Sequence, residues 1–185
     1  SADAGALSGP GVASGGNTDL TFGIDTSAAG VFSGTASLGL SSHNDDLADL
    51  NLASETFNLT GTVNNLAKPT FALTSGDATL TGGGTLYNLV FDTVLDTDNS
   101  FLMADLSVIN DVLGPADMLD GFFDISSTGV FSALGFTPID DLVAGAAHSG
   151  LMVGFDTSTQ SPGAFMASIF FDPSSVFAGL ADVNL

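Results

Sequence analysis

The sequence predicts an all-β fold in which many short strands form an antiparallel sandwich. Three observations lead to this prediction: segments in which apolar and polar residues alternate, abundant turn-forming residues between them, and an internal repeat. The chain of 185 residues contains 23 Gly and 21 acidic residues, all of them Asp except Glu55. Because Asp hydrogen-bonds to nearby backbone groups and Gly tolerates turn conformations, this composition indicates that turns separate the strands.

The alternating segments give the strands in chain order. In residues 31–40 (VFSGTASLGL) most even positions are apolar, while positions 33, 35 and 37 carry Ser or Thr. Residues 56–63 (TFNLTGTV) show the same two-residue period, which is typical of a half-buried strand. Further strands are expected at residues 20–24, 86–91, 101–109, 151–155 and 165–171. Residues 112–119 and 139–147 are the two segments that could hold a helical turn or two.

The internal repeat is the most informative feature of the sequence. Residues 22–27 (FGIDTS) return as residues 153–158 (VGFDTS), and residues 47–52 (LADLNL) return as residues 180–185 (LADVNL). The later matches are displaced by two more residues than the earlier ones, which a short insertion explains. Residues 1–52 therefore correspond to roughly residues 132–185.

The repeat divides the chain into two expected parts. Residues 1–67 are predicted to be the closing half of one repeat, and residues 68–185 a second repeat that lacks its last strand, the equivalent of residues 56–63. A sandwich without a terminal strand exposes an unpaired edge. Either the protein continues beyond both ends of this chain, or a neighbouring molecule supplies the strand by donor-strand addition.

The sequence around residues 20–69 resembles a known family. The runs IDTSAAGVFSGTASLGLSSHNDD and FNLTGTVNNLAKPTF are similar to the closing half of the Ig-like repeats in bacterial surface proteins of the "choice-of-anchor D" type. Residues 86–94 (LYNLVFDTV) and 108–117 (VINDVLGPAD) resemble the opening half of the next repeat. The resemblance implies tandem Ig-like sandwiches and a non-catalytic module that is extracellular or displayed on a bacterial cell surface.

We expect a structural role, in a cell-surface layer, a filament or an adhesin. The partners would be neighbouring repeats or copies of the chain itself. The alternative is a calcium-dependent recognition module that binds a glycan or a protein.

The charge balance argues against several other classes of protein. Lys68 is the only Lys or Arg, and the formal net charge is −20 at pH 7. Such a chain cannot neutralise phosphates, so we expect no nucleic-acid partner. No apolar run approaches the roughly 18 residues of a transmembrane helix. The absence of Cys excludes thiolate zinc sites and thiol catalysis.

Calcium is the expected cofactor, if there is one, because it prefers the carboxylate and carbonyl oxygens that Asp-rich turns supply. One candidate cluster contains Asp45, Asp46 and Asp49, and the other contains Asp92, Asp96 and Asp98. The second cluster lacks the Gly and Glu of an EF-hand loop. Weaker candidates are Asp140 with Asp141 and Asp117 with Asp120; for every cluster, turn capping and solubility are the alternative explanation.

Catalysis is not expected. The only two histidines, His43 and His148, lie in segments whose equivalents in the other copy lack His, and both are predicted to be surface residues. The pairs Phe122–Phe123 and Phe170–Phe171 are expected to direct one ring of each pair outward, because consecutive strand residues face opposite sides. A contiguous patch of such rings would mark an association surface.

Overall fold

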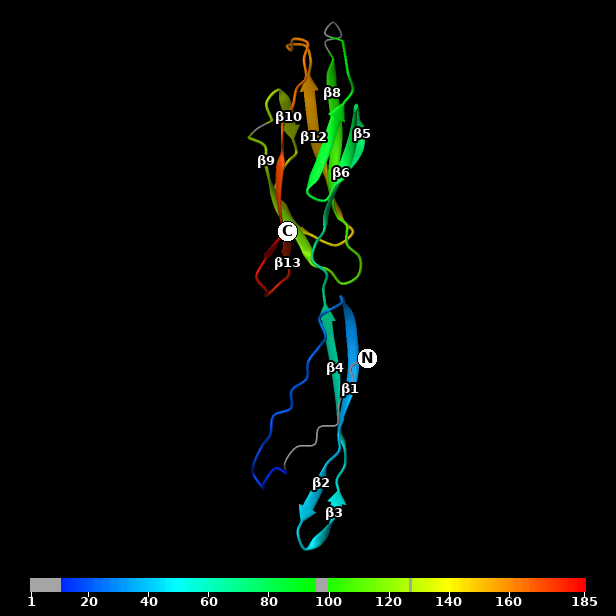
Figure 1. Cartoon of the computed structure of the whole chain (residues 1–185), viewed down its shortest axis with the longest axis vertical. Helices are drawn as coiled ribbons and strands as arrows, with labels where there is room; N and C mark the ends of the chain where they lie inside the picture. Colours follow the sequence, from blue (N-terminus) through cyan, green and yellow to red (C-terminus); the bar gives the residue numbers. More distant parts are fainter. Residues whose placement is uncertain (1–10, 96–99, 127) are drawn as a thin grey trace. The chain divides into compact units, whose positions relative to one another are not determined.

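The computed structural model describes residues 11–95, 100–126 and 128–185, and it consists of β-strands and irregular segments with no helix among these residues. Several antiparallel sheets are present, which confirms the all-β prediction and is consistent with a β-sandwich (Figure 1). The chain divides into two compact units, Ser1–Val63 and Asn64–Leu185.

The first unit contains two separate two-stranded sheets. Strand β1 (Gly30–Leu38) pairs antiparallel with β4 (Glu55–Val63) along its whole length, from Gly30 opposite Val63 to Leu38 opposite Glu55. Between them in sequence, β2 (Ser41–Asn44) and β3 (Leu47–Asn51) form a hairpin. None of residues 11–63 is fully buried.

The second unit contains two four-stranded sheets and a hairpin. The first sheet has the order β10-β12-β8-β5, and the second has the order β11-β9-β13-β14. Strands β6 and β7 pair only with each other. The bounds are β5 Pro69–Gly76, β6 Ala78–Gly83, β7 Leu86–Phe91, β8 Phe101–Asn110, β9 Met118–Asp124, β10 Phe131–Leu134, β11 Ile139–Leu142, β12 Ala147–Asp156, β13 Phe170–Val176 and β14 Val183–Asn184.

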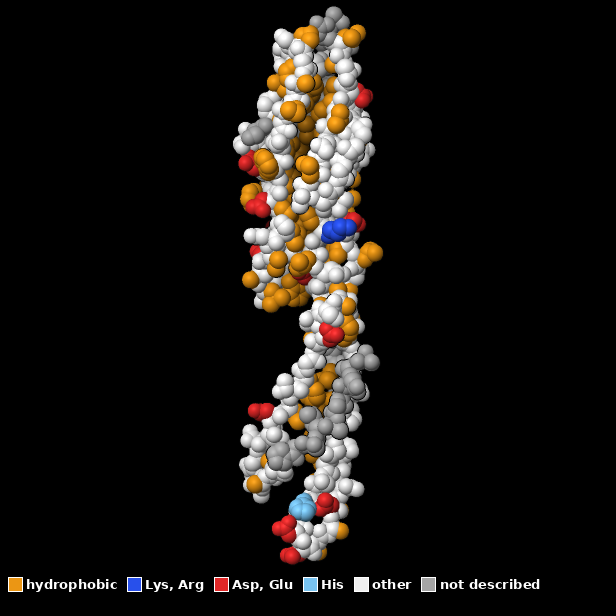
Figure 2. Space-filling model, in the orientation of Figure 1, with side chains coloured by type: hydrophobic (Ala, Val, Ile, Leu, Met, Phe, Trp, Pro, Cys, Tyr) orange, Lys and Arg blue, Asp and Glu red, His pale blue; other side chains and the backbone are white. Residues whose placement is uncertain are grey.

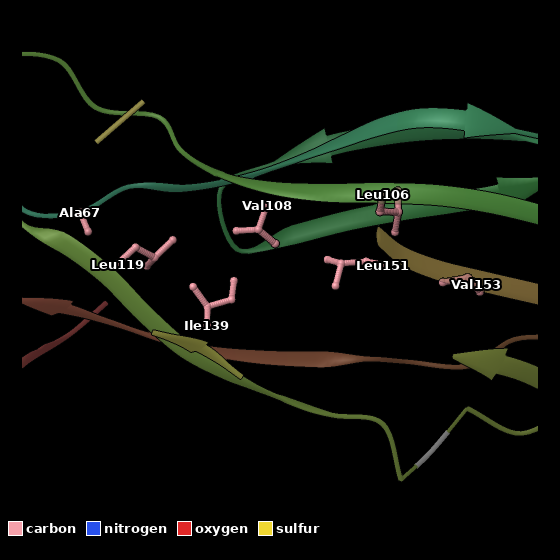
Figure 3. Close-up of a cluster of buried hydrophobic side chains, with 7 residues drawn as sticks. All are labelled: Ala67, Leu106, Val108, Leu119, Ile139, Leu151 and Val153. Atoms are coloured by element: carbon pink, nitrogen blue, oxygen red, sulfur yellow. The ribbon is translucent and has the colours of Figure 1, made fainter. Parts of the chain in front are cut away.

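The hydrophobic core of the second unit lies between its two four-stranded sheets (Figure 3). The first sheet contributes side chains from β8 and β12, and the second contributes Leu119 from β9 and Ile139 from β11. The cluster consists of Ala67, Leu106, Val108, Leu119, Ile139, Leu151 and Val153. Removing this apolar surface from water is the main stabilising contribution in such a fold.

Buried polar side chains anchor the beginning of the second unit. Asn110 is fully buried, and its Nδ2 donates hydrogen bonds to the carbonyl oxygens of Asp117 and Leu142. Its Oδ1 accepts a hydrogen bond from the backbone N–H of Lys68. The Ser175 hydroxyl, also buried, accepts from the N–H of Ala67. Every polar atom of the Asn110 side chain is thus paired, as burial requires.

Three expectations about individual elements were wrong or only partly right. Residues 20–24 form no strand; Phe22 packs on Phe57 of β4 with ring centroids 5.9 Å apart, but no backbone ladder joins the segments. The expected helical turns are absent, because residues 118–124 pair with β13 and residues 139–142 with β9. Asp141 has a φ of 52°, which no right-handed helix accommodates. Of residues 165–171, only Phe170 and Phe171 lie in a strand.

Two hairpins in different units have the same register. In the β2–β3 hairpin, Ser41 lies opposite Asn51. In the β13–β14 hairpin, Ser174 lies opposite Asn184, so both partners are displaced by 133 positions. The hydrogen bond from Leu52 N–H to the Leu40 carbonyl oxygen (2.9 Å) has its counterpart in the bond from Leu185 N–H to the Pro173 carbonyl oxygen (3.1 Å). The matching sequences thus form matching hairpins.

The DTS turns also match between the units. The Asp25 carboxylate accepts a hydrogen bond from the backbone N–H of Ser27 (2.9 Å), and the Asp156 carboxylate accepts one from the N–H of Ser158 (3.0 Å). Hydrogen bonds to the ionised form lower the pKa of Asp25, chiefly through the backbone of Ser27. The pKa of Asp156 is also lowered, chiefly through the hydroxyl of Ser158.

Candidate functional site

The second unit contains a segment that has no strand partner although its counterpart in the first unit is fully paired. By the displacement of 133 positions, residues 163–171 correspond to β1 (Gly30–Leu38), which pairs with β4 at every position. Residues 164–169 lie outside all strands. Their backbone N–H and C=O groups are therefore not engaged in a β-ladder within the described chain.

The unpaired segment is only partly buried. Phe165 and Ile169 are half-buried, whereas Ala164 and residues 166–168 are exposed. Met166 is 92% exposed. Burial does not alternate strictly along the segment, because Ala167 is exposed although Phe165 and Ile169, two residues away on either side, are half-buried.

A groove of about 1480 Å³ lies beside this segment, entirely within the second unit. Residues 160–171 line it without a break, and so do all six residues of β7. Its lining is predominantly apolar and includes the rings of Phe71, Tyr87, Phe91, Phe131, Phe136, Phe155, Phe165 and Phe171. Figure 2 shows hydrophobic side chains gathered in a lengthwise band on one face of this unit.

Aromatic contacts order the lining of the groove. The rings of Phe155 and Phe165 have centroids 5.3 Å apart, and those of Phe131 and Phe155 are 4.9 Å apart. Phe123 stacks on Phe171 at 4.6 Å. These distances are typical of aromatic pairs that stabilise one another. The unpaired segment therefore contacts the second unit through Phe165, and β13, which follows it, does so through Phe171.

The paired Phe residues point to opposite sides, as predicted. Phe122 and Phe170 are exposed, whereas Phe123 and Phe171 are half-buried. Because Phe122 lies on β9 opposite Asp172 of the neighbouring strand β13, the exposed rings belong to the outer face of the second sheet.

The first predicted calcium cluster is arranged around a histidine. The Asp49 carboxylate lies 2.6 Å from Nδ1 of His43, and the Asp45 carboxylate lies 3.2 Å from Nε2. The backbone N–H of Asp46 donates to the side-chain oxygen of Asn44. All five residues are exposed. Asp45 and Asp49 thus contact opposite sides of one imidazole ring.

Of the second predicted cluster, only Asp92 can be placed. It is exposed, and its backbone N–H donates to the carbonyl oxygen of Asp77 (3.2 Å). Asp96 and Asp98 lie outside the described residues.

The structure brings together a different carboxylate group, made of Asp120, Asp140 and Asp141. Within the described part of the chain it is the one group of three acidic or histidine residues whose ligand atoms lie within 4.8 Å of one another. The backbone N–H of Asp141 donates to Asp120 Oδ1 (2.6 Å). The sequence analysis placed Asp120 and the Asp140–Asp141 pair in separate, weaker clusters. The pairing of β9 with β11 brings these residues together, and no local sequence pattern predicts that pairing.

The two histidines differ in their surroundings. His43 is exposed, as predicted. His148, on β12, is half-buried, and its Nε2 atom is buried without a hydrogen-bond partner among the described residues. The surface prediction for His148 was therefore wrong, because His148 lies opposite Val108 of β8 and so shares the sheet face that carries this core residue.

Comparison with known proteins identifies no relative: no family model matches the chain, and neither the curated proteins nor the solved structures contain a match. Among the described residues, no helix has the length and apolar character needed to cross a membrane.

Proposed function

We propose that this chain is a non-catalytic structural and assembly module of a bacterial repeat protein that is secreted or displayed at the cell surface. In this proposal the two units belong to successive Ig-like repeats, within a surface layer, a filament or an adhesin. The observation that carries it is that the β2–β3 and β13–β14 hairpins have the same register. The first follows β1, which pairs with β4, and the second follows residues 164–169, which lie outside all strands.

Exposed apolar surface on the first unit supports an assembly role. Large apolar side chains there stay exposed, among them Phe57 on β4 and Leu50 on β3. Contiguous apolar surface on a soluble domain usually marks an interaction site. The net charge of −20 opposes non-specific clumping, so association should require complementary surfaces. The resemblance of residues 20–69 to repeats of bacterial surface proteins supports the proposed location.

Sedimentation velocity and negative-stain electron microscopy of the intact chain test this proposal. We expect ordered oligomers whose share increases with protein concentration. Their share should also increase with NaCl, because salt screens the repulsion between acidic molecules over a Debye length of about 8 Å at 0.15 M and 3 Å at 1 M. A monomer at every concentration and salt level would contradict the assembly role.

A calcium-dependent recognition module for a glycan or protein is the second candidate, and the Asp120, Asp140 and Asp141 group favours it. Three carboxylates that close together offer the oxygen ligands that calcium prefers. We expect isothermal titration with CaCl2 to give heat, and the double variant Asp140→Asn with Asp141→Asn to abolish it.

The matched control for the calcium test is the double variant Asp45→Asn with Asp49→Asn, which removes the same charge at the cluster around His43. Asn suits position 141 because it tolerates the left-handed backbone found there. No heat and no change in melting temperature upon adding calcium would exclude this candidate.

A further inference from the structure

We propose that the outer face of the second sheet, around Phe122 and Phe170, is a docking surface for a different protein whose extended basic segment presents arginine side chains. The proposal goes beyond the assembly role, because the partner is not a copy of this chain. It combines two exposed aromatic rings with the carboxylates that the pairing of β9 with β13 places beside them.

The register of β9 with β13 arranges two rings and two carboxylates in alternation. Phe122 lies opposite Asp172, and Asp124 lies opposite Phe170. Because strand residues two positions apart share a face, all four side chains project from the same side of the sheet, and all four are exposed. The two residues between them project from the other side, where their rings stack at 4.6 Å. Each outer ring therefore has a carboxylate across from it and another beside it on the same strand.

The exposure of the two outer rings indicates an interaction site. Phe122 is 55% exposed and Phe170 is 62% exposed. Large apolar side chains that are exposed together usually mark a binding surface. The two rings occupy diagonal positions of the strand pair, which lie about 7–8 Å apart. A planar group stacked between two rings needs about this separation, because each van der Waals contact measures about 3.5–4.0 Å.

The charge on the outer face favours a cationic partner. The Asp172 carboxylate is exposed and makes no hydrogen bond or ion pair with a described residue. Asp124 accepts a hydrogen bond from the backbone N–H of Ser126 (2.9 Å), and the contacts with Ser126, chiefly with its side chain, lower the pKa of Asp124. Asp120, two positions before Phe122, adds a third carboxylate to the same face. A neutral or acidic partner would leave this charge without a counterpart.

Arginine suits the combination of rings and carboxylates better than lysine does. Its guanidinium group is planar, so it stacks on an aromatic face while its N–H groups donate to carboxylates at the side. The ammonium group of lysine is a compact point charge that cannot stack in this way. An extended segment also places alternate side chains on one face, which matches a flat sheet surface.

A small pocket on the same face provides a place for one such side chain. It has a volume of about 250 Å³ and is lined by Phe122, Asp120 and Asp172, with Pro138 at its side. Sites for small ligands usually measure about 300–1,000 Å³. The pocket is therefore better suited to a single side chain of a larger partner than to a separate small molecule.

A second copy of this chain does not have the side chains that this surface requires. The chain contains no Arg, and its only Lys, Lys68, lies 3.2 Å from the Asp111 carboxylate. Two copies that each carry a net charge of −20 also repel each other. An anionic membrane surface is disfavoured for the same reason. The partner is thus a protein of opposite charge.

Isothermal titration of the intact chain with a synthetic peptide tests the chemistry of the partner. The peptide consists of repeated Arg-Thr units, so that its Arg side chains share one face when it is extended. In the control peptide each Arg is replaced by citrulline, which has a similar shape and no charge. EDTA is present in both titrations, so that no calcium neutralises the carboxylates. We expect the Arg peptide to bind at least about tenfold more tightly than the citrulline peptide, a ratio equivalent to about 1.4 kcal/mol.

A double variant separates specific docking from general attraction to an acidic protein. Phe122→Thr with Phe170→Thr removes both rings without changing the charge, and Thr favours strand conformation. The control, Phe101→Thr with Phe177→Thr, removes two rings that are also exposed but belong to other parts of the unit. We expect the Arg peptide to bind the first variant at least about tenfold more weakly than the control. Circular dichroism of each variant checks that the fold is intact.

A single charge substitution gives a second test that leaves both rings in place. We expect Asp172→Asn to weaken binding of the Arg peptide by about two- to fivefold, as is typical of an exposed ion pair. Asp92→Asn removes the same charge from an exposed position after β7 and should change the affinity less. Equal affinities for the two Phe variants, or for the Arg and citrulline peptides, would overturn the proposal.

Discussion

The two units share a hairpin but differ in what that hairpin packs against. Leu47 at the start of β3 and its counterpart Leu180 are both 71% exposed, so the hairpin ends have similar environments. The second unit nevertheless has fully buried residues such as Leu119 and Leu151, whereas residues 11–63 have none. The difference teaches that the local sequence suffices for a hairpin, while a core requires a second sheet facing the first.

The largest effect that tests this comparison is expected from shortening core side chains. Leu119→Ala or Leu151→Ala should lower the free energy of unfolding of the second unit by about 2–5 kcal/mol, because each leaves a cavity in a closely packed interior. Urea unfolding followed by the fluorescence of Tyr87, the only tyrosine in a chain without tryptophan, reports on the second unit.

The matched control for the core variants is Leu47→Ala. Its side chain is largely exposed on the first unit, so the Tyr87 transition should not move. If Leu119→Ala lowered the free energy of unfolding as little as Leu47→Ala does, the two units would not differ in packing as described.

A smaller but still large effect is expected at Asn110. Asn110→Ala leaves the carbonyl oxygens of Asp117 and Leu142 and the N–H of Lys68 without their partners. Each unsatisfied buried group costs about 1–3 kcal/mol. We expect a total loss in that range, because the three partner residues are themselves half-buried or exposed. Thermal unfolding monitored by circular dichroism measures the loss. Asn44→Ala, at an exposed turn of the first unit, is the control and should change the melting temperature little.

The smallest expected effect compares the DTS turns of the two units. The pKa of Asp156 is lowered mainly by the Ser158 hydroxyl, whereas that of Asp25 is lowered mainly by the Ser27 backbone. Ser158→Ala should therefore raise the pKa of Asp156 more than Ser27→Ala raises the pKa of Asp25. Titration of both carboxyl groups by NMR measures this difference, and equal shifts would contradict it.

The sign of the pH dependence follows from the direction of these shifts. An Asp whose pKa is lower in the folded state stabilises the fold above the ordinary pKa of about 3.9. This contribution is lost as the pH falls through the lowered pKa, when the folded carboxylate takes up a proton. Below the pKa values of both the folded and the unfolded state, the Asp carboxyl groups of the two turns add no stability.

Sequence patterns predicted those elements whose signal is local. Residues 31–40 and 56–63 alternate in polarity, residues 86–91 and 101–109 are rich in β-branched and aromatic residues, and strands occupy nearly all of these ranges. Residues 20–24 (LTFGI) alternate as well but form no strand, since a strand also needs a neighbour with free backbone groups. Residues 165–171 were also expected to form a strand, but residues 165–169 lack such a neighbour among the described residues.

The sites depended more strongly on non-local contacts. Asp120 and the Asp140–Asp141 pair are 20 or more positions apart, and only the antiparallel pairing of β9 with β11 brings their carboxylates together. The groove likewise combines β7 with residues 160–171. No local pattern contains such information, because it arises from the order of strands in sheets rather than from period or composition.

By itself the sequence determined that this protein is built from strands and turns, and that residues 47–52 recur as residues 180–185, because strand patterns and turn chemistry act over a few residues. Only the tertiary structure decided which side chains are buried, which carboxylates meet, and that residues 164–169 lie unpaired beside an apolar groove. The physical reason is that burial and strand pairing depend on segments far apart in the chain, whose approach is fixed by packing of the whole second unit.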